Sequence, residues 1–168
     1  MKPLWEVADL LRRVRREMRF GELSRAPLRL LRLQWRTGAV ECDWLSRPPD
    51  QWDTSLRRRE RDRSVSQQAL RDAIRFRDLI FSALPGVETA VLRAFRPSSA
   101  REPPNLIIAG DLVREAPAVL RVSSLAMRAK LYGFRFDLQE GVLQVLQFNE
   151  GAFEVRETKQ IFIQAITQ

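Results

Sequence analysis

The alternation of residues 31–45 constrains the fold of this chain more than any other feature. A two-residue turn at Thr37-Gly38 would sort the flanking side chains onto the two opposite faces of a β-hairpin. The apolar face would place Trp35 opposite Val40, Leu33 opposite Cys42 and Leu31 opposite Trp44. The polar face would place Gln34 opposite Glu41 and Arg32 opposite Asp43. A three-residue loop would mix the two faces, so the segment predicts a half-buried hairpin.

A short helix over residues 28–35, behind Pro27, is the alternative for the first half of this segment, because Thr-Gly is a weaker turn signal than Asn-Gly. In the hairpin, Cys42 points into the apolar face, where a thiol stays protonated and unreactive. Cys42 is the only cysteine, so the chain cannot form an internal disulfide. We therefore do not expect a cysteine nucleophile.

Three segments have apolar residues at three- and four-residue steps, which predicts amphipathic helices over residues 3–19, 64–84 and 117–132. Pro3 suits the first turn of the first helix, and Pro85-Gly86 and Gly133 end the other two. The start of the second helix has two interpretations. Ser64 and Gln67 have the spacing of a capping box, whereas a start near Asp53 or Thr54 would place the basic residues before Ser64 on the exposed first turns.

Four further segments predict strands: 87–96, 105–113, 152–158 and 160–167. A second hairpin is predicted around Glu140-Gly141, with Leu138 opposite Leu143, Phe136 opposite Val145 and Asp137 opposite Gln144. Short turns between consecutive strands imply antiparallel pairing. The fold class we expect is α+β, with three helices packed on a largely antiparallel sheet. Residues 1–168 would form a single domain, in which a helix and hairpin over 1–52 could be a semi-independent N-terminal arm.

No stretch of apolar residues is long enough for a transmembrane helix, so we expect no membrane partner. Glu6 and Asp9 interrupt the apolar run that a secretory signal would need. The expected location is cytoplasmic.

Histidine is absent, which excludes Ser-His-Asp and Cys-His catalysis and zinc sites that use histidine. An enzyme would have to use carboxylates, Arg, Lys, Tyr or an oxygen-bound metal such as Mg²⁺. No glycine-rich phosphate loop occurs, and the Asp111 of Ala109-Gly110-Asp111 is read as a turn residue. Glu41 and Asp43 would share a hairpin face, but each has a polar residue opposite it. We expect no cofactor and no metal.

The net charge of +8 arises entirely in residues 1–77, because the remaining 91 residues carry equal numbers of basic and acidic side chains. The densest basic run lies at residues 57–63, where Glu60 and Asp62 would partly pair with the arginines of the same helix face. The functional interpretation is a phosphate-binding patch that the first helix extends. The candidate anion- or nucleic-acid-binding residues are Arg57, Arg58, Arg59, Arg61, Arg63, Arg12, Arg15, Arg16 and Arg19.

The four tryptophans also lie in the first half of the chain. The hairpin assigns Trp35 and Trp44 to its inward face. Trp5 lies beside the apolar stripe of the first helix and Trp52 lies in a proline-rich loop, so these two are candidate anchors for a partner.

These features support three hypotheses in order of preference. The first is a non-enzymatic interaction or assembly protein that self-associates, since spare aromatic and arginine side chains are typical of interface centres. The second is a nucleic-acid-binding protein that uses the 57–63 run with the first helix, although no known nucleic-acid-binding motif occurs. The third is a small enzyme acting on an anionic substrate, which requires a pocket where an acid and arginines converge.

Overall fold

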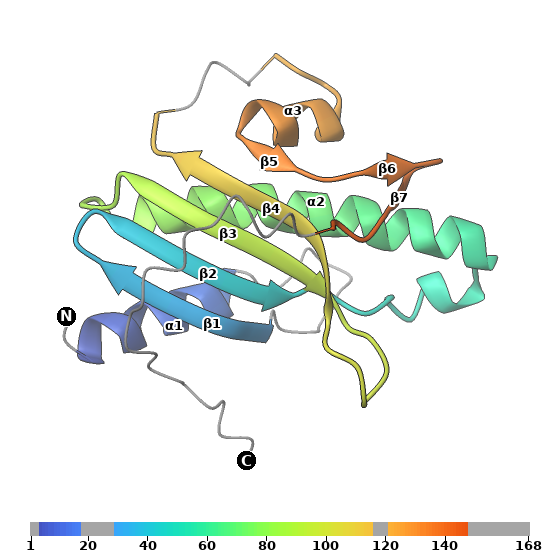
Figure 1. The fold of residues 1–168 in the computed structure, drawn as a ribbon, viewed down its shortest axis with the longest axis horizontal. Helices are drawn as coiled ribbons and strands as arrows, with labels where there is room; N and C mark the ends of the chain where they lie inside the picture. Colours follow the sequence, from blue (N-terminus) through green and yellow to red (C-terminus); the bar gives the residue numbers. More distant parts are fainter. Residues whose placement is uncertain (1–3, 18–28, 116–120, 148–168) are drawn as a thin grey trace.

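The computed structural model describes residues 4–17, 29–115 and 121–147, and Figure 1 shows their arrangement. The helices are α1 (Leu4–Glu17), α2 (Arg58–Ala83) and α3 (Leu125–Leu131), with a 3-10 turn, η1, at Asp53–Ser55. The strands are β1 (Arg29–Arg36), β2 (Ala39–Leu45), β3 (Thr89–Arg96), β4 (Asn105–Val113), β5 (Phe134–Arg135), β6 (Leu138–Gln139) and β7 (Val142–Leu143). This composition confirms the predicted α+β class with three helices.

The main sheet has five strands in the order β1-β2-β3-β4-β5. Adjacent strands are antiparallel except β2 and β3, which are parallel. Antiparallel pairing was predicted for strands joined by short turns, and the pair β1 and β2 confirms it. Between β2 and β3 the chain passes through α2, which carries it back to the start of β3, and such a crossover produces parallel neighbours. The sheet remains largely antiparallel, as expected.

The hairpin formed by β1 and β2 confirms the turn predicted at Thr37-Gly38, where Gly38 has a φ of 74°. Trp35 lies opposite Val40 and Leu33 lies opposite Cys42, in the predicted register. The register then shifts between Leu30 and Arg32, as at a β-bulge, so Leu30 rather than Leu31 lies opposite Trp44. Leu31 is consequently exposed. The alternative of a short helix over 28–35 is wrong for residues 29–35, which are extended.

The core lies between the main sheet and α2, which crosses behind it in Figure 1. Val40, Cys42 and Trp44 project from one face of β2 and are buried. The Trp44 indole meets the Phe76 ring of α2 edge to face, with centroids 5.0 Å apart. Because side chains alternate along a strand, the acids of β2 project from the opposite face. The hairpin therefore contributes to the same core as α2, through its predicted apolar face.

Helix α2 begins at Arg58, so both predicted starts are wrong. The Ser64 hydroxyl donates to the carboxylate of Asp53 at 2.9 Å and does not cap a helix. Asp53 and Thr54 belong to the separate η1 turn. The start predicted near Asp53 or Thr54 was correct in one respect, because it placed the basic run on the first turns of the helix, where the structure has it. The helix ends at Ala83, just before Pro85-Gly86, as predicted.

Helix α3 is shorter than the predicted helix over 117–132, because Ser124 caps it by accepting a hydrogen bond from the Met127 amide at 3.3 Å. Residues 116–120 lie outside the described part of the chain, as do the predicted strands 152–158 and 160–167. The hairpin at Glu140-Gly141 is confirmed, with Leu138 opposite Leu143.

Asp111 was expected in a turn, and this prediction is wrong. It lies within β4, next to β5, and its carboxylate forms an ion pair with Arg135 of that strand at 3.3 Å. The strand spans Asn105–Val113, which confirms the strand predicted over 105–113 and places Asp111 inside it. In the described ranges, no helix is both long and apolar enough to cross a bilayer.

Candidate interaction site

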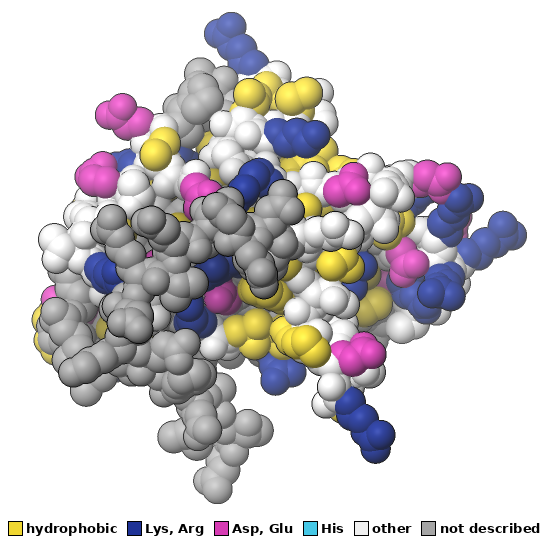
Figure 2. Space-filling model, in the orientation of Figure 1, with side chains coloured by type: hydrophobic (Ala, Val, Ile, Leu, Met, Phe, Trp, Pro, Cys, Tyr) yellow, Lys and Arg dark blue, Asp and Glu magenta, His cyan; other side chains and the backbone are white. Residues whose placement is uncertain are grey.

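Two surfaces at opposite ends of α2 gather the exposed indoles and charges that the sequence singled out. The first surrounds the start of α2, and Figure 2 shows basic side chains concentrated at that end of the molecule. We call it the arginine end; it comprises Trp52, Leu56, Arg57, Arg58, Arg59, Arg61 and Arg63. The second lies beside the end of α2, next to α1. The two surfaces are separated by most of the length of a 26-residue helix, roughly 39 Å.

The arginine end is exposed because the chain folds tightly just before α2. The Thr54 amide donates to the carbonyl oxygen of Asp50 at 3.2 Å, and the Ser55 hydroxyl donates to that of Trp52 at 2.9 Å. These bonds occupy the loop backbone and leave the Trp52 indole in solvent, 69% exposed. Leu56, immediately before the helix, is 40% exposed. An apolar patch thus lies directly beside the arginines.

Helix stability does not explain why arginines occupy this end. Arg57 is the N-cap residue of α2, and no side chain caps its amides. The N-terminus of a helix carries partial positive charge, so each exposed cation there is unfavourable by about 0.3–1 kcal/mol. Arg57, Arg58 and Arg59 therefore lie where the helix dipole disfavours them.

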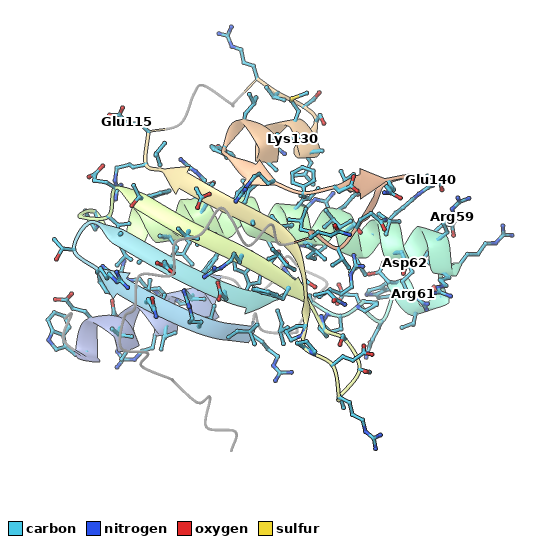
Figure 3. The ribbon with its side chains drawn as sticks, viewed as in Figure 1. Arg59, Arg61, Asp62, Glu115, Lys130 and Glu140 are labelled. Carbon is cyan, nitrogen blue, oxygen red and sulfur yellow. The ribbon has the colours of Figure 1, made fainter. Side chains whose placement is uncertain are left out.

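Carboxylates neutralise this run only in part. Arg58 and Asp62 are 4.0 Å apart, at the outer limit of an ion pair. Arg59 pairs with Glu140 at the turn between β6 and β7, which Figure 3 shows beside the first turns of α2. Arg63 donates from Nε to the backbone oxygen of Glu140 at 2.7 Å. Glu60 was predicted to pair with the run, but among the residues that the structure describes it forms no ion pair with these arginines. In the described ranges, neither Arg57 nor Arg61 forms an ion pair.

The second surface is a pocket of about 470 Å³ between α1, the turn joining β1 and β2, and the loop after α2. We call it the indole pocket, because Trp5 and Trp35 both line it. Trp5 is 69% exposed, although it lies on the first turn of a helix. The helix packs through Leu10 and Val14, which are buried, and this orientation leaves Trp5 at the rim of the core.

The charged residues that line the indole pocket are Glu6, Asp9 and Arg13. The Asp9 carboxylate accepts from Arg13 Nε at 3.2 Å and lies 4.0 Å from Arg12 Nη1. The side chains of Asp9, Arg12 and Arg13 are each about half exposed or more. Ion pairs at such positions contribute about 0–1 kcal/mol to the free energy of unfolding.

The predicted patch that joins helix 1 to the 57–63 run is not assembled. Arg12 and Arg16 are exposed on α1. Figure 1 shows α1 on the opposite side of the molecule from the start of α2, where Arg57 lies. The side chain of Arg15 and the whole of Arg19 lie outside the described part of the chain. Of these candidates, only Arg57, Arg58, Arg59, Arg61 and Arg63 therefore lie close together, around the start of α2.

The remaining sequence candidates have structural partners. Glu41 and Asp43 lie on the sheet face opposite α2, between Arg32 and Arg93, and Arg93 Nε donates to Asp43 at 2.7 Å. This network balances two carboxylates with two guanidinium groups. Burial raises the pKa of the Cys42 thiol well above its usual value of 9.0, and the neighbouring Asp43 adds to the effect. Across the described ranges, no three residues of the metal-binding types cluster closely enough to hold an ion.

Sequence reasoning missed Leu56, Glu140 and the role of Trp35 in a pocket. Leu56 follows a polar turn and shows no periodic signal, and Glu140 reaches Arg59 across 81 positions of the chain. One signal was available for Trp35. It lies two residues before the Thr37-Gly38 turn, near the end of a strand, where a side chain has fewer neighbours on one side. No protein-family model, curated protein or solved structure matches the chain, so no relative supplies a ligand or activity for either surface.

Proposed function

We propose that this protein is a non-enzymatic interaction protein that self-associates. The observation that carries the proposal is that Trp5 and Trp52 are each 69% exposed, one on each surface, next to charged side chains. Tryptophan and arginine are the residues most enriched among those that dominate binding energy at protein interfaces. An exposed indole beside a guanidinium group has the composition of an interface centre rather than of ordinary surface.

The state of the charges supports a binding role over catalysis. At the indole pocket, Asp9 is engaged with Arg12 and Arg13. At the arginine end, Asp62 and Glu140 are each engaged with an arginine. A general base needs a carboxylate that is held ready to accept a proton from a substrate. These three carboxylates are instead each paired with a guanidinium group.

Sedimentation velocity across the micromolar range tests the proposal. We expect the sedimentation coefficient to rise with protein concentration. Trp5→Ala and Trp52→Ala should each weaken this association, because each removes an exposed contact without opening the core. Met127→Ala is the matched control: Met127 is also apolar and exposed, but it lies on α3 and not on either surface. A single monomer boundary at every concentration would contradict the proposal.

Nucleic-acid binding at the arginine end is a second candidate, favoured by Arg57 and Arg61, which lack ion pairs in the described ranges and lie close in sequence to the exposed Trp52. Replacing Arg57, Arg58 and Arg59 with alanine should weaken binding to a labelled oligonucleotide, and each lost phosphate contact should lower the log–log salt slope by about 0.9 for duplex DNA. Arg12→Ala with Arg16→Ala is the control, because the structure places these residues elsewhere. Negligible binding by the unmodified protein at low salt would exclude this candidate.

A further inference from the structure

We infer that the start of α2 is a dimer contact, in which the arginine end of one molecule packs against the arginine end of a second copy. This inference rests on the proposed self-association and specifies its surface and its symmetry. Both molecules use the same patch, so the contact is two-fold symmetric, and such a contact requires a surface that is complementary to itself. The arginine end meets this requirement in its position, its charges and its apolar side chains.

The first two turns of α2 project from the body of the molecule. Figure 1 shows them extending past the ends of the strands of the main sheet. The buried residues of the helix begin only at Ser66, so none of residues 58–65 is fully buried. Most helical stability in proteins comes from the packing of a helix face, and these turns have little of it. A second copy packed against them would supply that burial.

One side of these turns is already used within the molecule. Arg59 and Arg63 are held by Glu140, on the turn between β6 and β7. Arg57 and Arg61 lie two residues from Arg59 in either direction, which places them about 200° around the helix axis from it. Figure 3 shows Arg59 on the side of α2 toward Glu140 and Arg61 on the other side. The side that carries Arg57 and Arg61 therefore faces away from the β6–β7 turn.

This second side carries charges of both signs. Glu60 lies between Arg57 and Arg61 in the chain, and all three residues are exposed or half-buried. Among the residues that the structure describes, none of the three forms an ion pair. When two copies of this side meet in opposite directions, the Glu60 of each copy lies against Arg57 and Arg61 of the other. Every ion pair then occurs twice, as two-fold symmetry demands.

The patch as a whole is close to neutral, which favours a second copy over a nucleic acid. Its five arginines are matched by five carboxylates on the same loop, helix start and neighbouring turn. A polyanion gains little from such a balance of charge, whereas two copies of the patch do not repel each other. The five carboxylates belong to Asp50, Asp53, Glu60, Asp62 and Glu140.

Trp52 and Leu56 supply the apolar part of the contact, since they are 69% and 40% exposed. The Ser64 hydroxyl donates to the carboxylate of Asp53, the residue after Trp52, at 2.9 Å. Ser64 lies three residues after Arg61, on the same side of the helix. This bond therefore ties the turn that carries Trp52 to the side of α2 with the unpaired charges. An indole among charged side chains is a common arrangement at interface hot spots.

A two-fold contact closes at a dimer, so any further growth has to use another surface, such as the indole pocket. Trp52→Ala should weaken the dimer by about thirtyfold or more, as loss of a hot spot does. Trp5→Ala alters the other surface and should reduce growth beyond the dimer instead. Sedimentation velocity at micromolar protein concentrations measures both effects, with Met127→Ala as the control for loss of an exposed apolar side chain.

Exchanging the charges of the contact in the full chain is the sharpest test. One variant carries Glu60→Arg, and the other carries Arg57→Glu with Arg61→Glu. Each variant alone places like charges opposite each other and should dimerise about tenfold more weakly than the unmodified chain, or worse. An equimolar mixture should form a heterodimer, because opposite signs face each other again in both halves of the contact. A chain with all three changes should recover the homodimer for the same reason.

The charge-matched control carries Arg71→Glu with Arg75→Glu. Both arginines are exposed on α2 but lie ten residues or more beyond Arg61, outside the contact. This control should dimerise like the unmodified chain. Circular dichroism and thermal unfolding check that every variant is folded, and recovery in the mixture shows independently that the two charge variants retain their structure.

Other results separate the inference from the proposed function. If the unmodified chain associates but Trp52→Ala or either charge variant does so equally well, the contact lies elsewhere and self-association stands. The same conclusion follows if the mixture of charge variants stays monomeric. A chain that is monomeric at every concentration overturns the proposed function and the inference together. In that case, loss of binding to a labelled oligonucleotide by Arg57→Glu with Arg61→Glu would assign the arginine end to nucleic acid.

Discussion

The guanidinium group of Arg47 and the carboxylate of Asp72 form a buried bidentate ion pair. Arg47 donates from Nε to Oδ2 at 2.9 Å and from Nη2 to Oδ1 at 2.6 Å. The pair joins the loop after β2 to the middle of α2, and Gln68 also donates to Asp72 at 3.0 Å. Burial lowers the pKa of Arg47 to about 10, although Asp72 opposes this effect. Burial also raises the pKa of Asp72, against the influence of Arg47.

Removing one partner of this pair should be strongly destabilising. Asp72→Ala removes the carboxylate that accepts two hydrogen bonds from the buried Arg47 guanidinium, and such losses lower the free energy of unfolding by about 3–5 kcal/mol. Urea-induced unfolding measures the change. The double variant Arg47→Met/Asp72→Leu is the comparison, because it removes both charges and keeps apolar volume. It should be more stable than Asp72→Ala, and the reverse order would contradict this account of the pair.

Cys42 should make the stability depend on pH above its ordinary pKa. The unfolded thiol releases its proton near pH 9.0, whereas the folded thiol, with its raised pKa, retains it. The unfolded state then binds fewer protons, so the free energy of unfolding falls as the pH rises above 9.0, by up to about 1.4 kcal/mol per pH unit.

Denaturation curves at a series of pH values, for the unmodified chain and for Cys42→Ala, measure this contribution as the difference between the two slopes. The native thiol should also resist a thiol reagent at pH 8 and react fully in denaturant. Rapid labelling of the folded protein would show that Cys42 is accessible, contrary to the structure.

Gly110→Ala should destabilise the junction of β4 and β5. A Cβ at this position would lie 2.7 Å from Cδ1 of Phe134 and 2.8 Å from Cδ2 of Leu112, and both side chains are buried. Overpacking of this kind costs about 1–3 kcal/mol. Gly86→Ala is the matched control, since its Cβ would meet nothing within 4 Å. Thermal unfolding should show a lower Tm for Gly110→Ala only; equal Tm values for the two variants would argue against the close packing of Phe134.

Arg114 should stabilise the end of α2, although it belongs to the chain just after β4. Its guanidinium donates to the carbonyl oxygens of Phe81 at 2.8 Å, Leu84 at 2.6 Å and Val87 at 2.7 and 2.9 Å. The last turn of α2 contains no basic residue of its own. Arg114 therefore supplies the positive charge and the donors that the helix terminus lacks.

Arg114→Met should lower the free energy of unfolding by about 1.5–3 kcal/mol, the usual loss for hydrogen bonds to a charged group. Chemical denaturation measures the loss. Arg121→Met, at an exposed position, should change the stability by less than about 0.5 kcal/mol. An equally small effect at Arg114 would mean that water satisfies these carbonyls as well as the guanidinium does.

The pattern of residues along short segments was enough to predict those helices, strands and turns whose conformation depends on residues close by in the sequence. The alternation on either side of Thr37-Gly38 predicted the turn and the register as far as Leu33 and Cys42, because cross-strand pairs in a tight hairpin are close in sequence. Pro85-Gly86 predicted the end of α2, since proline cannot continue a helix. The alternation failed at Leu31, where a register shift changed which residue faces Trp44.

The sequence by itself determined the α+β class, the basic run and the two tryptophans that lie outside the core, because each follows from the periodicity or order of residues close along the chain. Only the tertiary structure decided the parallel pairing of β2 with β3, the separation of the α1 arginines from Arg57, and the meeting of Trp5 and Trp35 in one pocket. These relationships join segments distant in the chain. Their geometry depends on how the sheet and α2 pack, and no local spacing of residues encodes it.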